Sequence, residues 1–436
     1  MFQEKLLNKD TEATRLFALL EELYPICRSI TGDGVRKTLR ILQEYVPLDI
    51  HELPTGTEVF DWTIPKEWNI QEAWIKNSNG DKLIDFRRSN LHVLNYSIPV
   101  DKVMALSELK EHLHTLPDQP DLIPHKTSYF KEQWGFCLTH NQFIDLEEGN
   151  YHVFIDSTLE DGHMTYGELL IKGTTSDEVL ISTHVCHPSL CNDNLSGISV
   201  AVHLAQYLLK KQDLRYSYRF LFIPATIGSI AWLAQNEKNV DDIKHGLVLS
   251  CLGDRGDTMT YKRSRKGNAS IDKLVEQMLD DSDQAYEIRE FLPYGYDERQ
   301  FCSPGFDLPV GLFMRTPFGE FPEYHTSADN LNFIDAEALG ESLSMLKKVV
   351  YRIEHNRSYQ NLKPKGEPNL GKRGLYKLIG GKTDVEISQM AILWVLNLSD
   401  GKHSLLDIAR RSGITFQAIK QAADALEHAN LLKLLS

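Results

Sequence analysis

The stretch THVCHPSLCNDNLSG, residues 183–197, decides the organisation of this chain. It follows the short apolar run EVLIS and precedes the longer apolar segment ISVAVHLAQYLL. A short apolar run bounded by polar residues is typical of a buried strand, and a longer one is typical of a helix. The stretch is therefore expected to turn from strand to helix, and it places His184, His187 and Asp193 within ten positions of one another.

The same alternation continues toward the C-terminus. Short apolar runs predict strands, and segments of 11 to 16 residues predict the helices between them. The expected strands are 178–183, 218–226, 245–254 and 308–316, and the expected helices are 196–211, 228–238 and 270–281. Strands that alternate with helices predict an α/β fold with a mixed sheet and helices on both faces. Functional sites in such sheets lie beyond the carboxyl ends of the strands.

The flanking regions predict further domains. Apolar positions spaced by three and four predict two helices near the N-terminus, and short alternating or aromatic runs after them predict β structure. Beyond the α/β part, a polar stretch with Pro and Gly predicts a linker, and helices joined by Gly turns predict a winged helix-turn-helix. The expected segments are 1–49 (helices of the α/β domain), 50–172 (β-rich inserted domain), 173–357 (α/β domain), 358–375 (linker) and 376–436 (winged helix).

Composition narrows the classes of function. Lys and Arg number 47 against 61 Asp and Glu, so the net charge of −14 argues against nucleic acid or an anionic membrane as the main partner. From residue 376 onward, seven Lys and Arg stand against six Asp and Glu, which favours protein contact over DNA binding there. The chain has no run of 18 apolar residues and no apolar signal-peptide core, so we expect a cytoplasmic protein with reduced cysteines and no membrane span.

The polar residues after the expected strands include metal-binding types. His184 and His187 follow the first strand, Asp193 stands before the next helix, and His325 follows a later strand. Two histidines and one carboxylate leave a fourth tetrahedral position open, as in catalytic zinc sites. Taken singly, each residue also fits a hydrogen-bonded strand end or a helix N-cap. Together, at equivalent strand ends, they favour a metal site.

Five segments carry a family resemblance: YPICRSITGDGVR, THVCHPSLCNDNLSG, IPATIGS, YDERQFCSPGFDLPVG and PEYHTSADN. They resemble the zinc aminopeptidase superfamily, which includes the glutaminyl cyclases. They are more closely similar to a bacterial aminopeptidase-like family with an inserted β domain and a C-terminal winged helix. The resemblance covers nearly the whole chain. It implies that Asp193 and His325 bind zinc together with either His187 or His184, and His187 is slightly favoured.

Position 225 departs from this resemblance. Similar proteins carry Glu in Pro-Glu-Thr-Ile-Gly-Ser, where it resembles the general base that takes a proton from water, but this chain has Ala225. Alanine accepts no proton, so we expect impaired turnover. A substitution made by design, a natural loss of activity, and replacement by another carboxylate all stay open. Thr226 and Cys251 stand where the superfamily binds a second metal, which favours a single zinc ion.

Further residues have weaker claims on the site. Asp297 resembles a carboxylate that orients a ligand or binds the substrate's amino group. Glu320 and Glu323 precede the late histidine and could accept a substrate ammonium group, and Arg263 and Arg265 could hold a substrate carboxylate. Asp297 and the two glutamates fit an exposed turn or loop charge equally well, and for the two arginines a plain loop charge is favoured.

The expected function is therefore a zinc-dependent, aminopeptidase-like hydrolase of a small peptide or aminoacyl amide, impaired by Ala225. Two alternatives stay open. Ala225 and the winged helix favour a catalytically silent ligand-binding or regulatory protein. A glutaminyl cyclase-like acyl transferase would use the same zinc to activate an amide without attack by water. We expect a homo-oligomer with no membrane or nucleic-acid partner.

Overall fold

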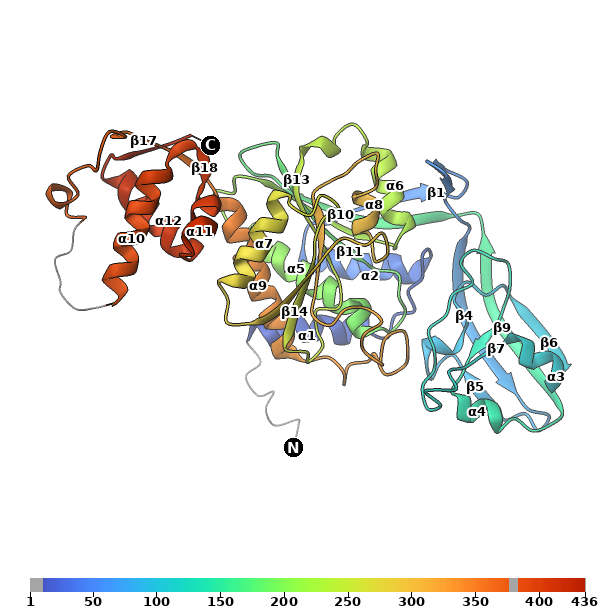
Figure 1. Cartoon of the computed structure of the whole chain (residues 1–436). Helices are drawn as coiled ribbons and strands as arrows, with labels where there is room; N and C mark the ends of the chain where they lie inside the picture. Colours follow the sequence, from blue (N-terminus) through green and yellow to red (C-terminus); the bar gives the residue numbers. More distant parts are fainter. Residues whose placement is uncertain (1–10, 376–382, 436) are drawn as a thin grey trace. The chain divides into compact units, whose positions relative to one another are not determined.

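The computed structural model describes residues 11–375 and 383–435 (Figure 1). The chain forms two compact units. The first lies within Met1–Gly267 and Glu287–Ser344, and the second lies within Asn268–Tyr286 and Met345–Ser436. Among the residues that the structure describes, no helix is both long enough and apolar enough to cross a membrane.

An eight-stranded mixed sheet forms the centre of the first unit. Its strands follow the order β1-β10-β12-β11-β13-β16-β14-β15. In that order they are β1 (Asp49–Pro54), β10 (His163–Ile171), β12 (Ser217–Ile223), β11 (Glu178–His184), β13 (Ile243–Leu249), β16 (Val310–Met314), β14 (Thr258–Lys262) and β15 (Ala285–Arg289). The four strands from β12 to β16 are parallel, and β1, β10 and β14 pair antiparallel. Every residue of β11 is buried, as expected for a strand covered on both faces.

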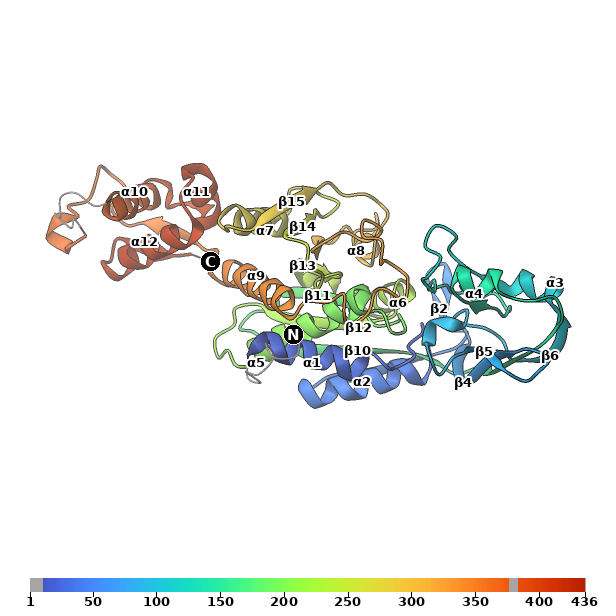
Figure 2. The same ribbon diagram turned by 90° about the horizontal axis from the view of Figure 1, so that it is seen from below.

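Helices cover both faces of this sheet, as the sequence predicts (Figure 2). The first unit contains α1 (Glu12–Leu23), α2 (Asp33–Tyr45), α5 (Gly197–Leu209), α6 (Ile227–Asn236) and α8 (Glu298–Phe301). The connection from β11 to β12 carries α5, and the connection from β12 to β13 crosses back with α6. Because such crossovers are right-handed, the two helices lie on opposite faces. α1 and α2 pack against α5, and α8 packs against α6.

The reversal of direction makes the carboxyl end of β11 a topological switch point, where open α/β sheets bind ligands. The chain enters α5 through the irregular segment Cys191–Ser196. α5 starts directly against β13, because a Cβ atom on Gly197 would lie 2.7 Å from the carbonyl oxygen of Leu249. The glycine of DNLSG is therefore required by this close approach.

A β-rich inserted domain separates β1 from β10. Its main sheet has the order β5-β4-β9-β6 and is antiparallel throughout. The domain contains β2 (Glu58–Val59), β3 (Trp62–Thr63), β4 (Glu67–Lys76), β5 (Lys82–Asp85), β6 (Val100–Ala105), α3 (Leu106–Leu109), β7 (Leu113–His114), β8 (Phe136–Cys137), α4 (His140–Ile144) and β9 (Asn150–Glu160). The expected segment 50–172 differs at both ends, because β1 and β10 pair in the eight-stranded sheet.

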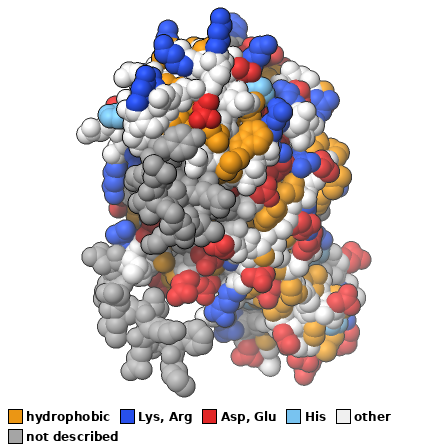
Figure 3. Space-filling model, turned by 60° about the vertical axis from the view of Figure 1, so that its left-hand side comes forward, with side chains coloured by type: hydrophobic (Ala, Val, Ile, Leu, Met, Phe, Trp, Pro, Cys, Tyr) orange, Lys and Arg blue, Asp and Glu red, His pale blue; other side chains and the backbone are white. Residues whose placement is uncertain are grey.

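The second unit contains the winged helix. Its elements are α7 (Ser270–Asp280), the C-terminal part of α9 (Ala336–His355), β17 (Ser358–Asn361), α10 (Thr383–Leu398), β18 (Asp400–Ser404), α11 (Leu405–Ser412), α12 (Phe416–His428) and β19 (Leu432–Leu434). β17 pairs with both β18 and β19. The segment 358–375, expected as a linker, therefore contributes a strand to the winged-helix sheet. Lys and Arg are interspersed with Asp and Glu on the face shown in Figure 3.

The helix α7 also differs from expectation, because it groups with the second unit and not with the α/β domain. Arg410 of α11 pairs with Glu276 of α7 at 3.2 Å. The carboxylate of Asp281, just after α7, accepts hydrogen bonds from the backbone N–H of Phe416 at 3.0 Å and from Arg352 at 2.8 Å. These side-chain contacts, between residues far apart in sequence, hold α7 to the winged helix.

Candidate metal centre

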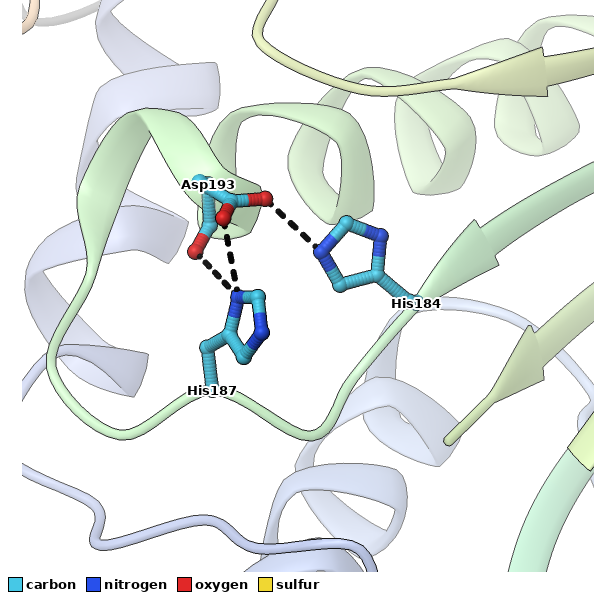
Figure 4. A group of neighbouring side chains, drawn as sticks. All are labelled: His184, His187 and Asp193. Atoms are coloured by element: carbon cyan, nitrogen blue, oxygen red, sulfur yellow. Dashed lines mark hydrogen bonds and ion pairs between the residues drawn. The ribbon is translucent and has the colours of Figure 1, made fainter. Parts of the chain in front are cut away.

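Asp193 is the hub of a cluster at the carboxyl end of β11 (Figure 4). Its carboxylate is fully buried. One oxygen, Oδ1, lies 2.9 Å from His184 Nε2 and 2.9 Å from the Tyr296 hydroxyl. The other, Oδ2, lies 2.9 Å from His325 Nε2 and 3.1 Å from His187 Nδ1. The structure therefore brings together all four residues that the sequence proposed for the metal.

The electrostatics of the cluster keep the Asp193 carboxylate charged. Burial alone raises the pKa of a carboxyl group, but the imidazoles of His187, His184 and His325 outweigh burial and hold the pKa of Asp193 well below its usual value. Burial lowers the pKa of His184, although Asp193 opposes that shift. The pKa of His187 is raised, because the attraction of the Asp193 charge exceeds the effect of burial.

The hydrogen bonds around His184 fix its tautomer. The side chain of Asn194 accepts from Gly197 N–H through Oδ1 at 3.2 Å and donates through Nδ2 to the Leu249 carbonyl at 3.1 Å. With the amide oriented in this way, Nδ2 also faces His184 Nδ1 at 3.2 Å. Nδ1 of His184 is therefore an acceptor, and the protonated Nε2 donates to Asp193.

His187 has the opposite tautomer. Its Nδ1 lies 2.9 Å from the backbone carbonyl oxygen of Asp193, and a carbonyl only accepts. Nδ1 of the neutral ring therefore carries the proton, and Nε2 has a free lone pair. A backbone carbonyl that fixes the ring in this way is typical of metal-binding histidines. The side chain of His187 is 17% exposed, whereas that of His184 is fully buried.

A cavity of about 360 Å³ opens beside His187 and His325. Ala225 and Thr226, which follow β12, lie in its wall. Its lining residues are Ile30, Asn95, His125, Lys126, Thr127, Tyr129, Cys186, His187, Ala225, Thr226, Tyr294, Gly295, Tyr296, Arg299, Phe318, Tyr324 and His325. The expected general base position thus faces the same space as the histidines, and it carries only a methyl group.

His125, from the inserted domain, is a site residue that the sequence analysis missed. Its ring centroid lies 5.1 Å from that of His187 and 5.2 Å from that of His325, and the latter two are 5.1 Å apart. Its backbone N–H donates to the His325 carbonyl at 2.7 Å, and Pro124 forms a β-bridge with Thr326. His125 stands in DLIPHKTSYF, far from the other motifs in the sequence. The only signal for a role in metal binding is that it is a histidine.

The two further positions proposed for a second metal carry no carboxylate. Cys251, just after β13, is fully buried, and burial raises the pKa of its thiol well above the usual value. Its sulfur lies 3.5 Å from the Tyr296 hydroxyl. Thr226 is the N-cap residue of α6. Cys186 and Cys191 are buried free thiols, so neither takes part in a disulfide.

Asp297 directly follows the lining residue Tyr296 and is fully buried. Its Oδ1 accepts a hydrogen bond from Ser229 of α6 at 2.8 Å, and its Oδ2 is buried without a partner. Burial raises the pKa of this carboxyl to about 7. The buried position differs from the surface turn that the sequence also allowed.

The other proposed substrate-binding residues do not line the cavity. Glu320 forms a two-pronged ion pair with Arg289, one bond of which is 2.8 Å long. Arg265 pairs with Asp307 at 2.9 Å, and Arg263 pairs with Glu290. Glu323 contributes its backbone carbonyl, which accepts from the Thr326 hydroxyl at 2.7 Å. These residues stay predictions without support from the geometry.

The fold is similar to that of zinc aminopeptidases of known structure. A zinc aminopeptidase from Bacillus subtilis shares the fold with a TM-score of 0.57 and 13% identity, over 79% of this chain and 95% of that one. The precursor of an M28 peptidase from Shewanella amazonensis has a TM-score of 0.53 and 12% identity, over 81% and 96% of the two chains. At these identities the similarity concerns the fold.

The chain belongs to the family described as domain of unknown function DUF4910, which matches residues 17–356. A winged helix-turn-helix family matches residues 357–434. A Clostridium acetobutylicum protein is 54% identical over 98% of both chains, and its name assigns it provisionally to polysaccharide biosynthesis, with an aminopeptidase-like domain. A crystal structure of a C. acetobutylicum protein, provisionally called a peptidase, is 52% identical with a TM-score of 0.93, over 100% of this chain and 99% of that one.

Proposed function

We propose that this protein is a metal-dependent hydrolase that cleaves an amide bond in a small peptide or an aminoacyl amide. The observation that carries the proposal is the buried Asp193 carboxylate, which contacts three imidazoles, two of which line a cavity at the switch point of the sheet. The aminopeptidase-like domain in the name of the 54% identical relative supports it. So does the provisional description of the 52% identical structure as a peptidase.

The donor set fits zinc. Zinc prefers imidazole nitrogen and carboxylate oxygen in sites of four ligands, and the cluster presents these atoms within 4.8 Å of one another in His184, His187 and Asp193. We assign His187, Asp193 and His325 as the residues that hold the ion. His184 would position Asp193 through the hydrogen bond from its Nε2. Zinc bound there supplies Lewis acidity, which polarises the carbonyl group of a scissile amide.

The described lining of the cavity lacks a carboxylate that could take a proton from water during hydrolysis. Amide hydrolysis adds the oxygen of water to the acyl carbon and delivers a proton to the departing amine, so a group must take a proton from water. Ala225 has no such group, and no Asp or Glu is among the lining residues. We therefore expect slow turnover. The same observation favours a second candidate, a protein that binds its ligand without turning it over.

Metal analysis tests the proposed function. Protein purified without added metal is expected to contain one zinc ion per chain. A chelator should remove the ion together with any hydrolysis of aminoacyl amides, and added zinc should restore both. A protein that contains no zinc and binds none would rule out the hydrolase. Zinc binding without detectable hydrolysis, even after long incubation, would leave the ligand-binding candidate.

The location, the oligomeric state and the partners of the protein stay predictions. A cytoplasmic location, a homo-oligomer and the absence of a nucleic-acid partner are predictions made from the sequence. We also propose that Asp297 acts indirectly, because its buried carboxyl accepts a hydrogen bond from Ser229 of α6 and it directly follows the lining residue Tyr296.

A further inference from the structure

We infer that the cavity selects a substrate with a carboxylate, or a similar small anion, beside the scissile amide, and not a substrate with a free ammonium group. The inference rests on the proposed function, because it names the substrate class of the same site. Its basis is the charge of the side chains that face the cavity, above all Arg299 and Lys126.

The Lys, Arg, Asp and Glu side chains that line the cavity have one sign. Arg299 and Lys126 are the only Lys, Arg, Asp or Glu residues among its described lining. The Asp193 carboxylate lies beneath the imidazoles and has no exposed surface. A free ammonium group entering this space would meet two cations and no carboxylate. A carboxylate would meet two cations and, from Tyr129 and Tyr294, hydroxyl groups able to donate.

Arg299 differs from several arginines of the first unit in forming no ion pair with a described residue, although Asp297 and Glu298 lie near enough to interact with its charge. Arg36, Arg219 and Arg289 all form ion pairs with carboxylates at 3 Å or less. No ion pair joins Arg299 to a described residue, and its buried Nε has no hydrogen-bond partner. A buried donor left without a partner costs about 1–3 kcal/mol, which a ligand oxygen would recover.

The nearby carboxyl of Asp297 does not form an ion pair with Arg299. The Oδ2 atom of Asp297 is itself buried without a partner, so the two unpaired atoms do not meet. Burial raises the pKa of Asp297 to about 7, which makes it a weak counter-charge at neutral pH. The guanidinium of Arg299 is therefore available to a planar carboxylate, which it binds with two parallel hydrogen bonds.

Lys126 brings a second cation from the inserted domain. Its Nζ lies 3.2 Å from His114 Nδ1 and makes no ion pair with a carboxylate of the described residues. It directly follows His125, whose backbone is hydrogen-bonded to the His325 segment, so Lys126 is tied to the metal centre. Ala225 adds to the selectivity, because a glutamate there would place a negative charge in the same space.

Titration calorimetry with three probes of similar size tests the inference. N-acetyl-L-alanine carries a carboxylate, N-acetyl-L-alaninamide is neutral, and L-alaninamide carries an ammonium group. We expect N-acetyl-L-alanine to bind most tightly to the zinc-loaded protein, with an affinity that falls as salt is added. Arg299→Gln should raise its Kd about ten- to a hundredfold, the usual value of a charged hydrogen bond.

Arg87→Gln is the matched control, because Arg87 is an exposed arginine of the same unit that pairs with Glu72 outside the cavity. It should change the Kd by less than about twofold. Lys126→Gln, on an exposed side chain, gives a second variant if Arg299→Gln does not fold, and it should raise the Kd several-fold. Tighter binding of L-alaninamide, equal effects of the Arg299 and Arg87 variants, or no binding of N-acetyl-L-alanine at millimolar concentration would overturn the inference.

The titrations test the anion site separately from the proposed hydrolase activity. The same titrations on metal-free protein measure the contribution of Arg299 without zinc. A protein that binds no zinc but prefers the carboxylate probe would contradict the hydrolase and keep the anion site. A zinc protein that prefers L-alaninamide would keep the hydrolase and contradict the anion site.

Discussion

Two neighbouring strands of the central sheet end differently. β11 and β12 are parallel and in register, with His184 opposite Ile223. The segment after β11 supplies a buried carboxylate and two imidazoles, all held by hydrogen bonds. The segment after β12 supplies Ala225 and Thr226, which carry no titratable group. One strand end therefore retains the donors for a metal, and the other lacks a base for proton transfer.

This difference indicates that ligand binding and proton transfer are separable in this fold. The bonds that hold Asp193 come from β11, from the loop after it, and from Tyr296 and His325. None of them involves the side chain at position 225. A substitution after β12 should therefore change the rate and leave the metal, and a substitution after β11 should remove the metal.

The largest effect is expected at the end of β12. Ala225→Glu places a carboxylate in the cavity wall, where it can take a proton from water. We expect hydrolysis to rise about 10²- to 10⁴-fold, the usual contribution of a general base. The rates are measured on L-alaninamide and on N-acetyl-L-alanine, with zinc content determined in parallel.

Ala225→Gln is the control for this change, because glutamine has the same shape and accepts no proton at neutral pH. It should stay at the level of the unchanged protein. If Ala225→Glu raises the rate by less than about tenfold with zinc bound, position 225 is not the place of the general base.

At the end of β11 the expected effect is loss of the metal. Asp193→Asn keeps the shape of the side chain but removes the charge on which His184, His187 and His325 converge. We expect zinc affinity to fall by more than about 100-fold. Substitution of a residue that only hydrogen-bonds to a metal ligand already lowers metal affinity about 10- to 100-fold. Competition with a chromophoric chelator measures it.

Asp241→Asn, on an exposed side chain, is the control and should bind zinc as the unchanged protein does. Unchanged zinc affinity in a folded Asp193→Asn protein would show that the ion, if present, lies elsewhere. The end of β11 would then not be the metal site.

The sequence predicts the strand ends well because local pattern determines them. The apolar run before His184 and the polar turn before Gly197 specify a strand, a turn and a helix without distant information. The mixed sheet and its covering helices follow from the same alternation, and the structure agrees. The resemblance to zinc aminopeptidases is likewise confirmed by the fold of the B. subtilis enzyme.

What the sequence could not predict depends on contacts between distant segments. His125 reaches the metal centre because the backbone around it pairs with the segment around Thr326, and no local pattern reveals that pairing. The assignment of α7 to the second unit has the same cause, since Glu276 is held by Arg410. The tautomers of His184 and His187 depend on which backbone carbonyls and amides face them.

A substitution of His125 tests whether zinc binding at the end of β11 also requires a residue of the inserted domain. The ring of His125 lies against those of His187 and His325, at centroid distances of 5.1 and 5.2 Å. It would therefore hold these two rings in position behind the ion. We expect His125→Ala to lower zinc affinity about 10- to 100-fold, measured by chelator competition.

His152→Ala serves as the control, since His152 is an exposed histidine of the same inserted domain that pairs with Asp101. It should leave zinc affinity unchanged. Equal affinities for the His125→Ala protein and this control would confine the metal centre to the α/β domain.

The smallest effect is expected where the inserted domain joins α2. Glu67 of β4 is 8% exposed and pairs with Arg36 of α2 at 2.5 Å. This hydrogen-bonded pair lowers the pKa of Glu67 from 4.5 to about 2. A carboxyl group whose pKa is lower in the folded state stabilises the protein above pH 4.5, and the stabilisation is lost as the pH falls toward 2.

We therefore expect Glu67→Gln to lower the free energy of unfolding by about 1–3 kcal/mol at pH 7, as for a charged hydrogen bond. The difference from the unchanged protein should shrink as the pH falls below 4.5 and vanish only below pH 2, where Glu67 is protonated in both states. Urea unfolding across this range measures it, with Glu108→Gln on an exposed side chain of the same domain as control. A difference that stays constant with pH would mean that Glu67 acts through packing and not through its charge. The inserted domain, with His125, would then depend on shape alone for its position on α2.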